Sequence, residues 1–352
     1  MYTDGHERED VVQYRQQKFL PRYHELHQRA AQFDNEGNQM PLEEPLHGDK
    51  EIVFHHHDES TFYGNDRRKF HWVHNSESPK PYAKGEGQSV MVADFVSSTL
   101  GWLSSPDGSK RARVALRPGK ARDGYFSSDE VLEQLTSAMD ILDEHYPSYQ
   151  HVFVLDNART HTKRAEDALS ARRMPKNPHP TFGVNSVVKD QYGNIIYDRN
   201  GKPLTKRCQM ENAAFADGTP QPLYFPSNHP QYPGYFKGMT QILRERGFIT
   251  PEKIRAECKG FKCNTDNCCQ RRILFNQVDF ANVPSLAESH CKARGYEVIF
   301  LPKFYPELSF IEMCWGFSKR LYRELPPSPK IEDIESNALW SLNQIPLPTM
   351  RR

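Results

Sequence analysis

Residues 151–156, HVFVLD, are the stretch that decides the fold class. The run is short, apolar and rich in β-branched residues, which predicts a central strand buried on both faces of a sheet. Asp156 stands at the carboxyl end of this strand. The chain therefore contains at least one buried strand, and the elements on either side of it show what surrounds that strand.

A helix is predicted immediately before this strand. Ser127 and Glu130 have the spacing of a capping box, and Val131, Leu135, Leu142 and Tyr146 lie along one apolar side. The helix ends by Pro147. A second helix is predicted after the strand, over residues 163–173.

Strands are predicted further upstream and downstream. Three antiparallel strands are expected from EIVFHHHDESTFY (51–63), KFHWVH (69–74) and SVMVADFVS (89–97). Downstream, YEVIFLP (296–302) predicts another strand, followed by a helix that begins near Ser309 and carries Glu312, Trp315 and Lys319 on one side. The fold class is therefore a mixed α/β sheet of five strands with helices on both faces.

Length and composition describe a folded protein. A chain of 352 residues, 37% of them hydrophobic, can bury a full core in one large domain or two modest ones. Apolar runs are shorter than the roughly 18 residues that cross a bilayer, and the charged opening MYTDGHERED is unlike a signal peptide. Seven cysteines, an odd number, predict reduced thiols in an intracellular compartment.

Three acids occupy positions suited to metal-assisted chemistry. Asp58 lies within the first strand, Asp156 at the tip of the buried strand, and Glu312 on the last helix of the sheet domain. Phosphodiester cleavage by two divalent ions requires clustered oxygen ligands, which carboxylates supply. Because the chain has 45 acidic residues, the surrounding sequence has to identify these three.

The sequence around each acid resembles the mariner-type branch of the DDE transposases. HHHDESTFY (55–63) is similar to the family's strand ending in Asp-Glu with a nearby Phe, and VFVLDNARTH (152–161) to its Asp-Asn with a His five residues after the Asp. LPKFYPELSFIEMCWGFSKR (301–320) resembles its Leu-Pro, Tyr-Pro and Ile-Glu pattern, with Trp three and Lys seven residues after the Glu. Ser309-Phe310 replaces the usual Asn-Pro, and the 312 − 156 = 156 residues between the last two acids exceed the usual separation.

The resemblance implies a ribonuclease-H-like fold and a metal-dependent endonuclease and strand transferase. Asp58, Asp156 and Glu312 would bind Mg²⁺ or Mn²⁺ in a two-metal site. Glu59, Asn157 and His161 would support these ligands, Lys319 would contact a phosphate, and Trp315 would act as an aromatic wedge or pack in the core. The implied partners are double-stranded DNA, as element ends and target, and a second copy of the chain in the active complex, in the nucleus.

The resemblance also divides the chain. Residues 1–48, with a helix broken near Pro21, are predicted to be a connecting arm. Residues 49–173 would form the first part of the catalytic domain and 296–352 its last strand and helices. The turn-rich stretch 174–295 between them is predicted to be a folded insertion, with a hairpin around residues 191–194.

Two clusters suggest further binding sites. The net charge of +1 gives no overall sign of nucleic-acid binding, but a stretch without acids could contact phosphates or be a solvated loop: Lys110, Arg111, Arg113, Arg117, Lys120 and Arg122. In the insertion, Cys258, Cys263, Cys268 and Cys269 are close enough in sequence for a structural Zn²⁺, with His290 or Cys291 as further candidates and free buried thiols as the alternative.

Three histidines and two other acids near the same sheet, Asp94 and Asp123, are weighed against the triad. His55, His56 and His57 precede Asp58, but strand alternation puts at most His56 on the same face as Asp58. Asp94 is predicted to be a hydrogen-bonded polar residue of its strand rather than a ligand. An alternative function is an inactive, domesticated or decaying transposase that only binds nucleic acid, and a third is a structure-specific nuclease.

Overall fold

The computed structural model describes residues 5–42, 48–66, 75–76, 84–119, 121–191, 195–263 and 265–351. The chain forms two compact units: unit 1 comprises Met1–Lys163 and Leu286–Arg352, and unit 2 comprises Arg164–Ser285. Unit 2 begins and ends ten residues before the limits of the insertion inferred from sequence (174 − 164 = 10 and 295 − 285 = 10). The helix that starts at Leu286 therefore belongs to unit 1.

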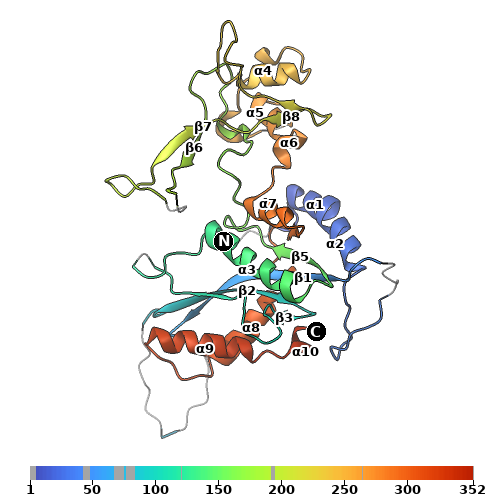
Figure 1. Ribbon diagram of the computed structural model, residues 1–352, viewed down its shortest axis with the longest axis vertical. Helices are drawn as coiled ribbons and strands as arrows, with labels where there is room; N and C mark the ends of the chain where they lie inside the picture. The colour runs from blue at the N-terminus through green and yellow to red at the C-terminus, as the bar shows by residue number, and fades with distance from the viewer. Residues whose placement is uncertain are drawn as a thin grey trace. The chain divides into compact units, whose positions relative to one another are not determined.

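Unit 1 is built on a mixed sheet (Figure 1). Its strands are β1 (Ile52–Tyr63), β2 (Ser89–Ser97), β3 (Gly101–Trp102), β4 (Val114–Leu116), β5 (Gln150–Leu155) and β10 (Glu297–Phe300). The spatial order is β10-β5-β1-β2-β3, and β4 also pairs with β2. β5 runs parallel to β1 and to β10, whereas β2 is antiparallel to β1. This order and these directions confirm the predicted ribonuclease-H-like α/β fold.

Six strands of the sheet lie within the described residues, so the predicted number of five was wrong. The predicted strand 69–74 lies outside the described residues. β3 and β4 share the antiparallel position on the far side of β2, where Trp102 pairs with Val96 and Leu116 with Met91. A turn at Gly108, which has a φ of +72°, separates the two short strands, and this interruption hides them from a search for strand periodicity.

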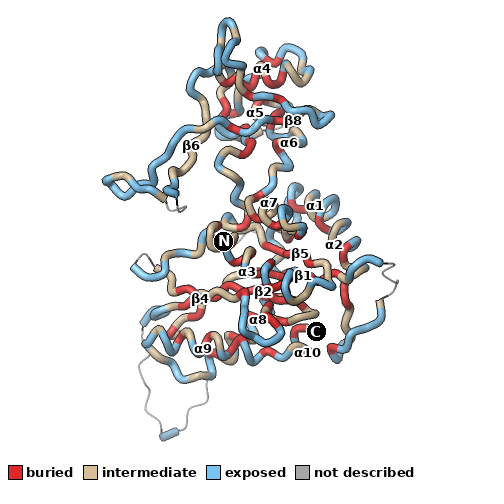
Figure 2. Tube along the Cα trace, in the orientation of Figure 1, coloured by how far each residue is buried: buried red, intermediate tan, exposed pale blue. Residues whose placement is uncertain are grey.

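Helices cover both faces of the sheet (Figures 1 and 2). Those of unit 1 are α1 (Glu9–Tyr14), α2 (Leu20–His27), α3 (Ser128–His145), α7 (Leu286–Ala293), α8 (Ile311–Tyr322), α9 (Ile331–Asn343) and α10 (Leu347–Met350). α3 and α7 pack on one face, around Phe95 and Phe153. α8 and α9 pack on the other face, around Phe62 and Val92. α2 packs on that same face, against Val152. The alternation of buried residues along β2 and β5 thus supplies two cores.

The helices next to β5 follow one prediction and contradict another. α3 begins with the predicted capping box, in which Ser127 and Glu130 satisfy each other's backbone N–H groups. The helix predicted over residues 163–173 was wrong, because only a short 3₁₀ turn, Ala171–Arg173, forms there. Leu169 and Ala171 are buried in the core of unit 2, so the chain leaves the sheet instead of packing a helix against it.

The amino-terminal helical segment is continuous rather than broken near Pro21. A π-helical turn, Arg15–Phe19, joins α1 to α2, and Pro21 lies in the first turn of α2. Proline has no N–H and its ring crowds the carbonyl group four residues earlier, and the wider π turn accommodates both effects. Phe19 and Leu26 are buried with Ile52, so the predicted connecting arm contributes to the core of unit 1.

Unit 2 has its own small core. Its elements are the strands β6 (Val184–Val187), β7 (Thr205–Cys208), β8 (Ala213–Ala214) and β9 (Pro220–Gln221) and the helices α4 (Gly238–Glu245), α5 (Gln270–Phe275) and α6 (Val278–Ala281). Met174, Phe236, Met239 and Leu274 are fully buried there. Beside the predicted hairpin tip, whose residues 192–194 lie outside the described part, Lys189 pairs with Ile195. Within the described residues, every helix is too short or too polar to cross a membrane.

Candidate active site

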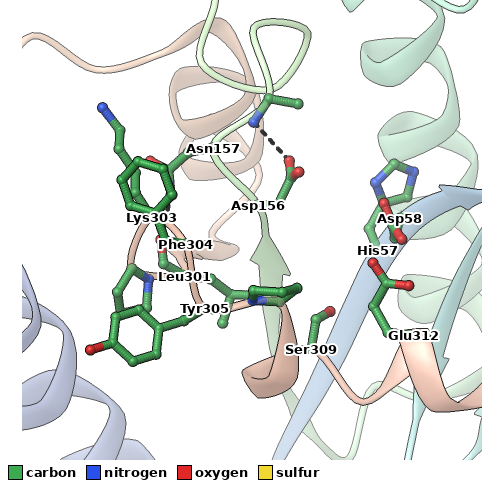
Figure 3. A pocket seen from close by; sticks show the side chains of 13 residues that line it. His57, Asp58, Asp156, Asn157, Leu301, Lys303, Phe304, Tyr305, Ser309 and Glu312 are labelled. Carbon is green, nitrogen blue, oxygen red and sulfur yellow. Dashed lines mark hydrogen bonds between the residues drawn. The ribbon is translucent and has the colours of Figure 1, made fainter. Parts of the chain in front are cut away.

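Asp58, Asp156 and Glu312 line one pocket of unit 1, with a volume of about 380 Å³. Asp58 lies on β1, Asp156 directly follows β5, and Glu312 is the second residue of α8. In Figure 3 the carboxyl groups of Asp58 and Glu312 lie beside each other, and Asp156 lies on the other side of the pocket, with its carboxyl group hydrogen-bonded to the Ala158 N–H. Three acids from distant parts of the sequence therefore border the same space.

The register of the sheet explains the position of the two aspartates. β1 and β5 are adjacent parallel strands, and the last residues paired between them are His56 and Val154. Asp58 and Asp156 each come two residues after that pair (58 − 56 = 2 and 156 − 154 = 2). The pocket opens where β5 ends and β1 continues, and α8 packs against β1 and contributes Glu312.

Asp58 is held in an environment that disfavours its negative charge. Burial, followed by the charge of Glu312, raises the pKa of Asp58 to about 7, and Glu59 and Asp156 add to the shift. The indole Nε1 of Trp315 donates a hydrogen bond to Asp58 Oδ2 over 3.2 Å. A cation in the pocket would relieve the repulsion among these carboxylates, so their electrostatics suit a metal site.

Asp156 is part of a chain of three charged groups. His161 Nδ1 contacts Asp156 Oδ1 at 2.5 Å, and its Nε2 lies 3.6 Å from Glu59 Oε1. Burial alone would lower the pKa of His161, but the hydrogen bond to Asp156 and the nearby negative charges of Glu59 and Asp156 outweigh it and raise that pKa to about 9. His161 is therefore an imidazolium at neutral pH, and it holds one oxygen of Asp156 in place.

The contacts of Asp156 leave its second oxygen for a ligand. The Ala158 backbone N–H also donates to Oδ1, at 2.8 Å. Both contacts that the described residues make with this carboxylate thus use Oδ1. Asn157 also lines the pocket, and its side-chain amide donates to the Leu301 carbonyl, which connects the end of β5 to the end of β10. His161 thus contacts Asp156 directly, and Glu59 contacts His161 from the other side of its ring.

His57 reaches the pocket although strand alternation puts it on the face opposite to Asp58. Its ring packs edge-on against His161, with centroids 5.0 Å apart, and its Nε2 lies 2.9 Å from Gln134 Oε1. Because β5 no longer covers that edge of β1, side chains from both faces of β1 border the opening. His56, on the same face as Asp58, packs against Phe310 and does not line the pocket.

Trp315 and Lys319 pack within the protein. The Trp315 side chain is only 2% exposed, and its ring lies 5.4 Å from that of Trp102, so it is unavailable as a wedge between bases. Lys319 is half-buried, with its ammonium group 5.8 Å from the centre of the Phe62 ring. Burial lowers the pKa of Lys319. Of the two alternatives for Trp315, packing is the one that its environment favours.

The basic stretch from Lys110 to Arg122 is largely committed to partners within the protein. Arg113 is buried and pairs with Asp94 and with Asn343. Arg111 also donates to Asn343, Lys110 pairs with Glu144, and Arg117 pairs with Glu335. Arg122 is exposed, and Lys120 lies outside the described residues. The interpretation of this stretch as a row of phosphate contacts is therefore wrong at Arg113, whose side chain is buried in an ion pair.

The structure also accounts for Asp94. Asp94 lies directly opposite Asp58 in the β1–β2 register, so sequence position alone cannot separate the two acids. Asp94 is fully buried, accepts from the Phe95 N–H at 2.8 Å and pairs with Arg113. It is absent from the residues that line the pocket, which agrees with its predicted structural role.

The cysteine cluster of the insertion is also assembled. The thiols of Cys258, Cys263, Cys268 and Cys269 all lie within 4.8 Å of one another in unit 2. The two further candidates were wrong: His290 contacts Thr136 at 2.8 Å, and Cys291 is buried in the core between α3 and α7. Both belong to unit 1.

Sequence patterns missed part of the pocket wall. Lys303, Phe304 and Tyr305 line the pocket from the turn between β10 and α8. Phe304 has a φ of +68°, an uncommon conformation for an aromatic residue, which marks a sharply bent backbone. Only the position of this turn beside Asp156 makes these residues part of the site, and no local spacing signals that position.

Comparisons with known proteins give partial likenesses. No protein-family model and no curated protein matches the chain. Among solved structures, a "Mos1 transposase paired-end complex with left transposon end" has 23% identity and a TM-score of 0.24, and covers 32% of this chain and 30% of that one. A "Mos1 mariner paired end complex with Mn" has 18% identity and a TM-score of 0.29, covering 47% of this chain and 40% of that one.

The corresponding complex with Mg has 18% identity, a TM-score of 0.28 and the same coverage. The chain thus matches less than half the length of these structures. The first of these structures is named as a Mos1 transposase complex and the other two as Mos1 mariner complexes. The TM-scores are low, and the fold assignment therefore rests on the order and direction of the strands.

Proposed function

We propose that the protein is a metal-dependent DNA endonuclease and strand transferase of the transposase type. The observation that carries the proposal is the convergence of Asp58, Asp156 and Glu312 on one pocket, although 156 residues separate the last two in the sequence (312 − 156 = 156). The resemblance of the sequence around each acid to the mariner-type transposases supports the same reaction.

The donor atoms fit Mg²⁺ or Mn²⁺. Both ions prefer carboxylate oxygens, and the three acids supply only such ligands. Burial and the charge of Glu312 raise the pKa of Asp58 to about 7, and a divalent cation beside these carboxylates would offset their mutual repulsion. When bound, two divalent ions activate the attacking water or hydroxyl and stabilise the leaving oxygen of the phosphodiester.

The protein's own groups would orient these ligands. The imidazolium of His161 and the Ala158 N–H fix Asp156 Oδ1, so that Oδ2 is left to ligate. The Trp315 indole fixes Asp58 Oδ2. Glu59 balances the charge of His161 on the side away from Asp156. Each contact already restricts the rotation of a carboxylate group, so that less conformational entropy would be lost when an ion binds.

The substrate under this proposal is double-stranded DNA, first at an element end and then at a target. Lys303 is exposed at the rim of the pocket and would contact a phosphate close to the reacting group. Arg122 is a second exposed cation for the duplex. A second copy of the chain in the active complex belongs to the same proposal.

Cleavage of supercoiled plasmid and of hairpin DNA with Mn²⁺ or Mg²⁺ tests the proposal. The protein is expected to nick both substrates, and Asp156→Asn and Glu312→Gln are each expected to lose about 100-fold or more of this activity. Glu133→Gln, an exposed substitution on α3 outside the pocket, is the matched control and should keep full activity.

The outcomes separate the alternatives. Strand-transfer products distinguish a transposase from a structure-specific nuclease. A protein that binds DNA but nicks neither substrate with either ion would overturn the proposal in favour of a non-catalytic binding protein. Equal activity of Glu312→Gln and Glu133→Gln would show that the pocket acids do not act together.

A further inference from the structure

The cysteine cluster of unit 2 is formed by a short loop and the start of a helix. Cys258 precedes the 3₁₀ turn Lys259–Phe261, Cys263 follows it, and Cys268 and Cys269 lie directly before α5. Gly260, within the turn, has a φ of +61°, a left-handed conformation that glycine adopts without strain. This bend reverses the chain between the first two thiols.

Backbone hydrogen bonds close this loop independently of the thiols. The Gln270 N–H donates to the Arg255 carbonyl at 3.0 Å, and the Arg271 N–H to the Ala256 carbonyl at 3.1 Å. These bonds attach the segment before Cys258 to the first turn of α5. The thiols are consequently brought together by the fold of the chain, which is the preorganisation that a metal site requires.

The distances between the sulfur atoms suit a single tetrahedral ion. Cys258 Sγ lies 3.4 Å from Cys268 Sγ, and Cys263 Sγ lies 4.0 Å from Cys269 Sγ. Four thiolates at a Zn–S distance of about 2.3 Å stand about 3.8 Å apart in a tetrahedron. A disulfide would require about 2.0 Å, and all four cysteines are free.

The surroundings suit a site with a net negative charge. Cys258 and Cys269 are buried, and Cys263 and Cys268 are partly buried, which protects the ligands from exchange with solvent. Arg272 interacts with Cys263, and Lys259 and Lys262 are exposed on the same loop. Four thiolates and one Zn²⁺ carry a net charge of −2, which these cations offset.

We propose that Cys258, Cys263, Cys268 and Cys269 bind one structural Zn²⁺ in unit 2. Four protein ligands complete the tetrahedron and leave no position for water or substrate, so the ion stabilises structure and takes no part in the reaction. It would hold the loop against α5, whose Ile273 and Leu274 are buried in the core of unit 2. This site is separate from the carboxylate pocket of unit 1.

The zinc content of the full chain, purified under reducing conditions without added metal, tests the proposal. Elemental analysis is expected to find one zinc per chain, and titration with a mercurial thiol reagent should release it as four thiolates react. Replacement with Co²⁺ should give the visible bands of a tetrahedral tetrathiolate. These measurements use the unaltered sequence and do not depend on whether a variant folds.

Variants then identify the ligands. Cys258→Ser and Cys269→Ser are each expected to lower the zinc content and the thermal midpoint, and chelation should lower the wild-type midpoint in the same way. Cys208→Ser, a partly buried cysteine of unit 2 outside the cluster, is the control and should keep one zinc per chain. Asp156→Asn should also keep it, because the carboxylate pocket is a different site.

Three results would overturn the proposal. The first is a reduced, folded protein that holds no zinc and takes up neither Zn²⁺ nor Co²⁺. The second is a mass two hydrogen atoms lower than that of the reduced chain under native conditions, which would show a disulfide. The third is bound iron with inorganic sulfide in place of zinc.

Discussion

At the scale of single residues, the pKa of Asp58 depends on the other charges of the pocket. Its carboxyl group is partly buried beside Glu312, and the burial together with the charge of Glu312 raises its pKa to about 7. A carboxyl whose pKa is raised in the folded state stabilises the protein at low pH, and this contribution is lost as the pH rises toward that pKa. Without metal, the folded protein therefore carries an electrostatic strain at neutral and basic pH.

Asp58→Asn is expected to stabilise the metal-free protein at high pH. The amide has nearly the same shape and no charge, so the free energy of unfolding should rise by on the order of 2 kcal/mol at about pH 8 and by much less at about pH 5. Urea unfolding in the presence of a chelator measures the difference. The same substitution should reduce the stabilisation produced by Mn²⁺.

Asp140→Asn is the control for this experiment, because its carboxylate is exposed and pairs with Arg294 at the surface. It should leave the response to Mn²⁺ unchanged. If Asp58→Asn destabilises the metal-free protein equally at both pH values, the carboxyl group has a structural role and the charge cluster is not the source of the strain.

At the scale of elements, β2 and the short strands beside it have a different role from β1 and β5. The sequence left two interpretations of the stretch that contains β4, a row of phosphate contacts or a solvated loop, and Arg113 fits neither because it pairs with Asp94 inside the fold. The two side chains are 6% and 1% exposed, so each charge depends on the other. Arg113 thus stabilises the sheet, whereas Arg122, further along the stretch, is exposed to solvent.

Arg113→Ala is expected to lower the free energy of unfolding by about 3–5 kcal/mol, because it leaves the Asp94 carboxylate buried without its partner. Arg122→Ala, the matched substitution at an exposed position, should change stability by less than about 0.5 kcal/mol. Denaturant unfolding of both variants measures this. A stable Arg113→Ala protein that binds DNA more weakly would instead favour the phosphate-contact interpretation.

The helix α8 keeps its start despite the departure from the family pattern. Ser309 and Phe310 stand where Asn-Pro is usual, and the Glu312 N–H still donates to the Ser309 carbonyl at 3.1 Å. Phe310 packs edge-on against His56, with ring centroids 4.7 Å apart. The aromatic contact anchors the first turn of α8 to β1, and Glu312 reaches the pocket from there.

At the scale of the whole molecule, unit 2 is an insertion with closely spaced ends. The Leu286 N–H donates to the Lys163 carbonyl at 2.7 Å, so the chain leaves and re-enters unit 1 at adjacent points. The cores of unit 1 consist of residues from unit 1, and unit 2 has a core of its own. The long separation between Asp156 and Glu312 is therefore compatible with an intact sheet.

Replacing residues 164–285 by a short Gly-Ser linker is expected to leave unit 1 folded. A linker of a few residues can join the two ends without strain, because its closure costs little entropy. Circular dichroism during heating should show a cooperative transition for the shortened chain. A shortened chain that melts without cooperativity at all temperatures would mean that unit 1 depends on unit 2 for its stability.

The sequence by itself determined the elements whose signals are local: the buried strand at residues 151–156, the capped helix at Ser127, and the fold class that follows from their order. The resemblance of the sequence around each acid to the mariner-type transposases singled out Asp58, Asp156 and Glu312, while short-range patterns assigned them to a strand, a strand end and a helix. The predicted helix at residues 163–173 failed because its apolar residues are buried in another unit, which no local period can reveal.

Only the tertiary structure decided which side chains work together. The register of β1 against β5 brings Asp58 and Asp156 to one pocket. Because β5 ends before β1 does, His57 also lines this pocket, from the opposite face of β1. Burial and pairing separate Arg113 and Asp94, which stabilise the sheet, from the acids of the pocket. These distinctions depend on long-range packing and on the local dielectric, and both arise only when distant segments come into contact.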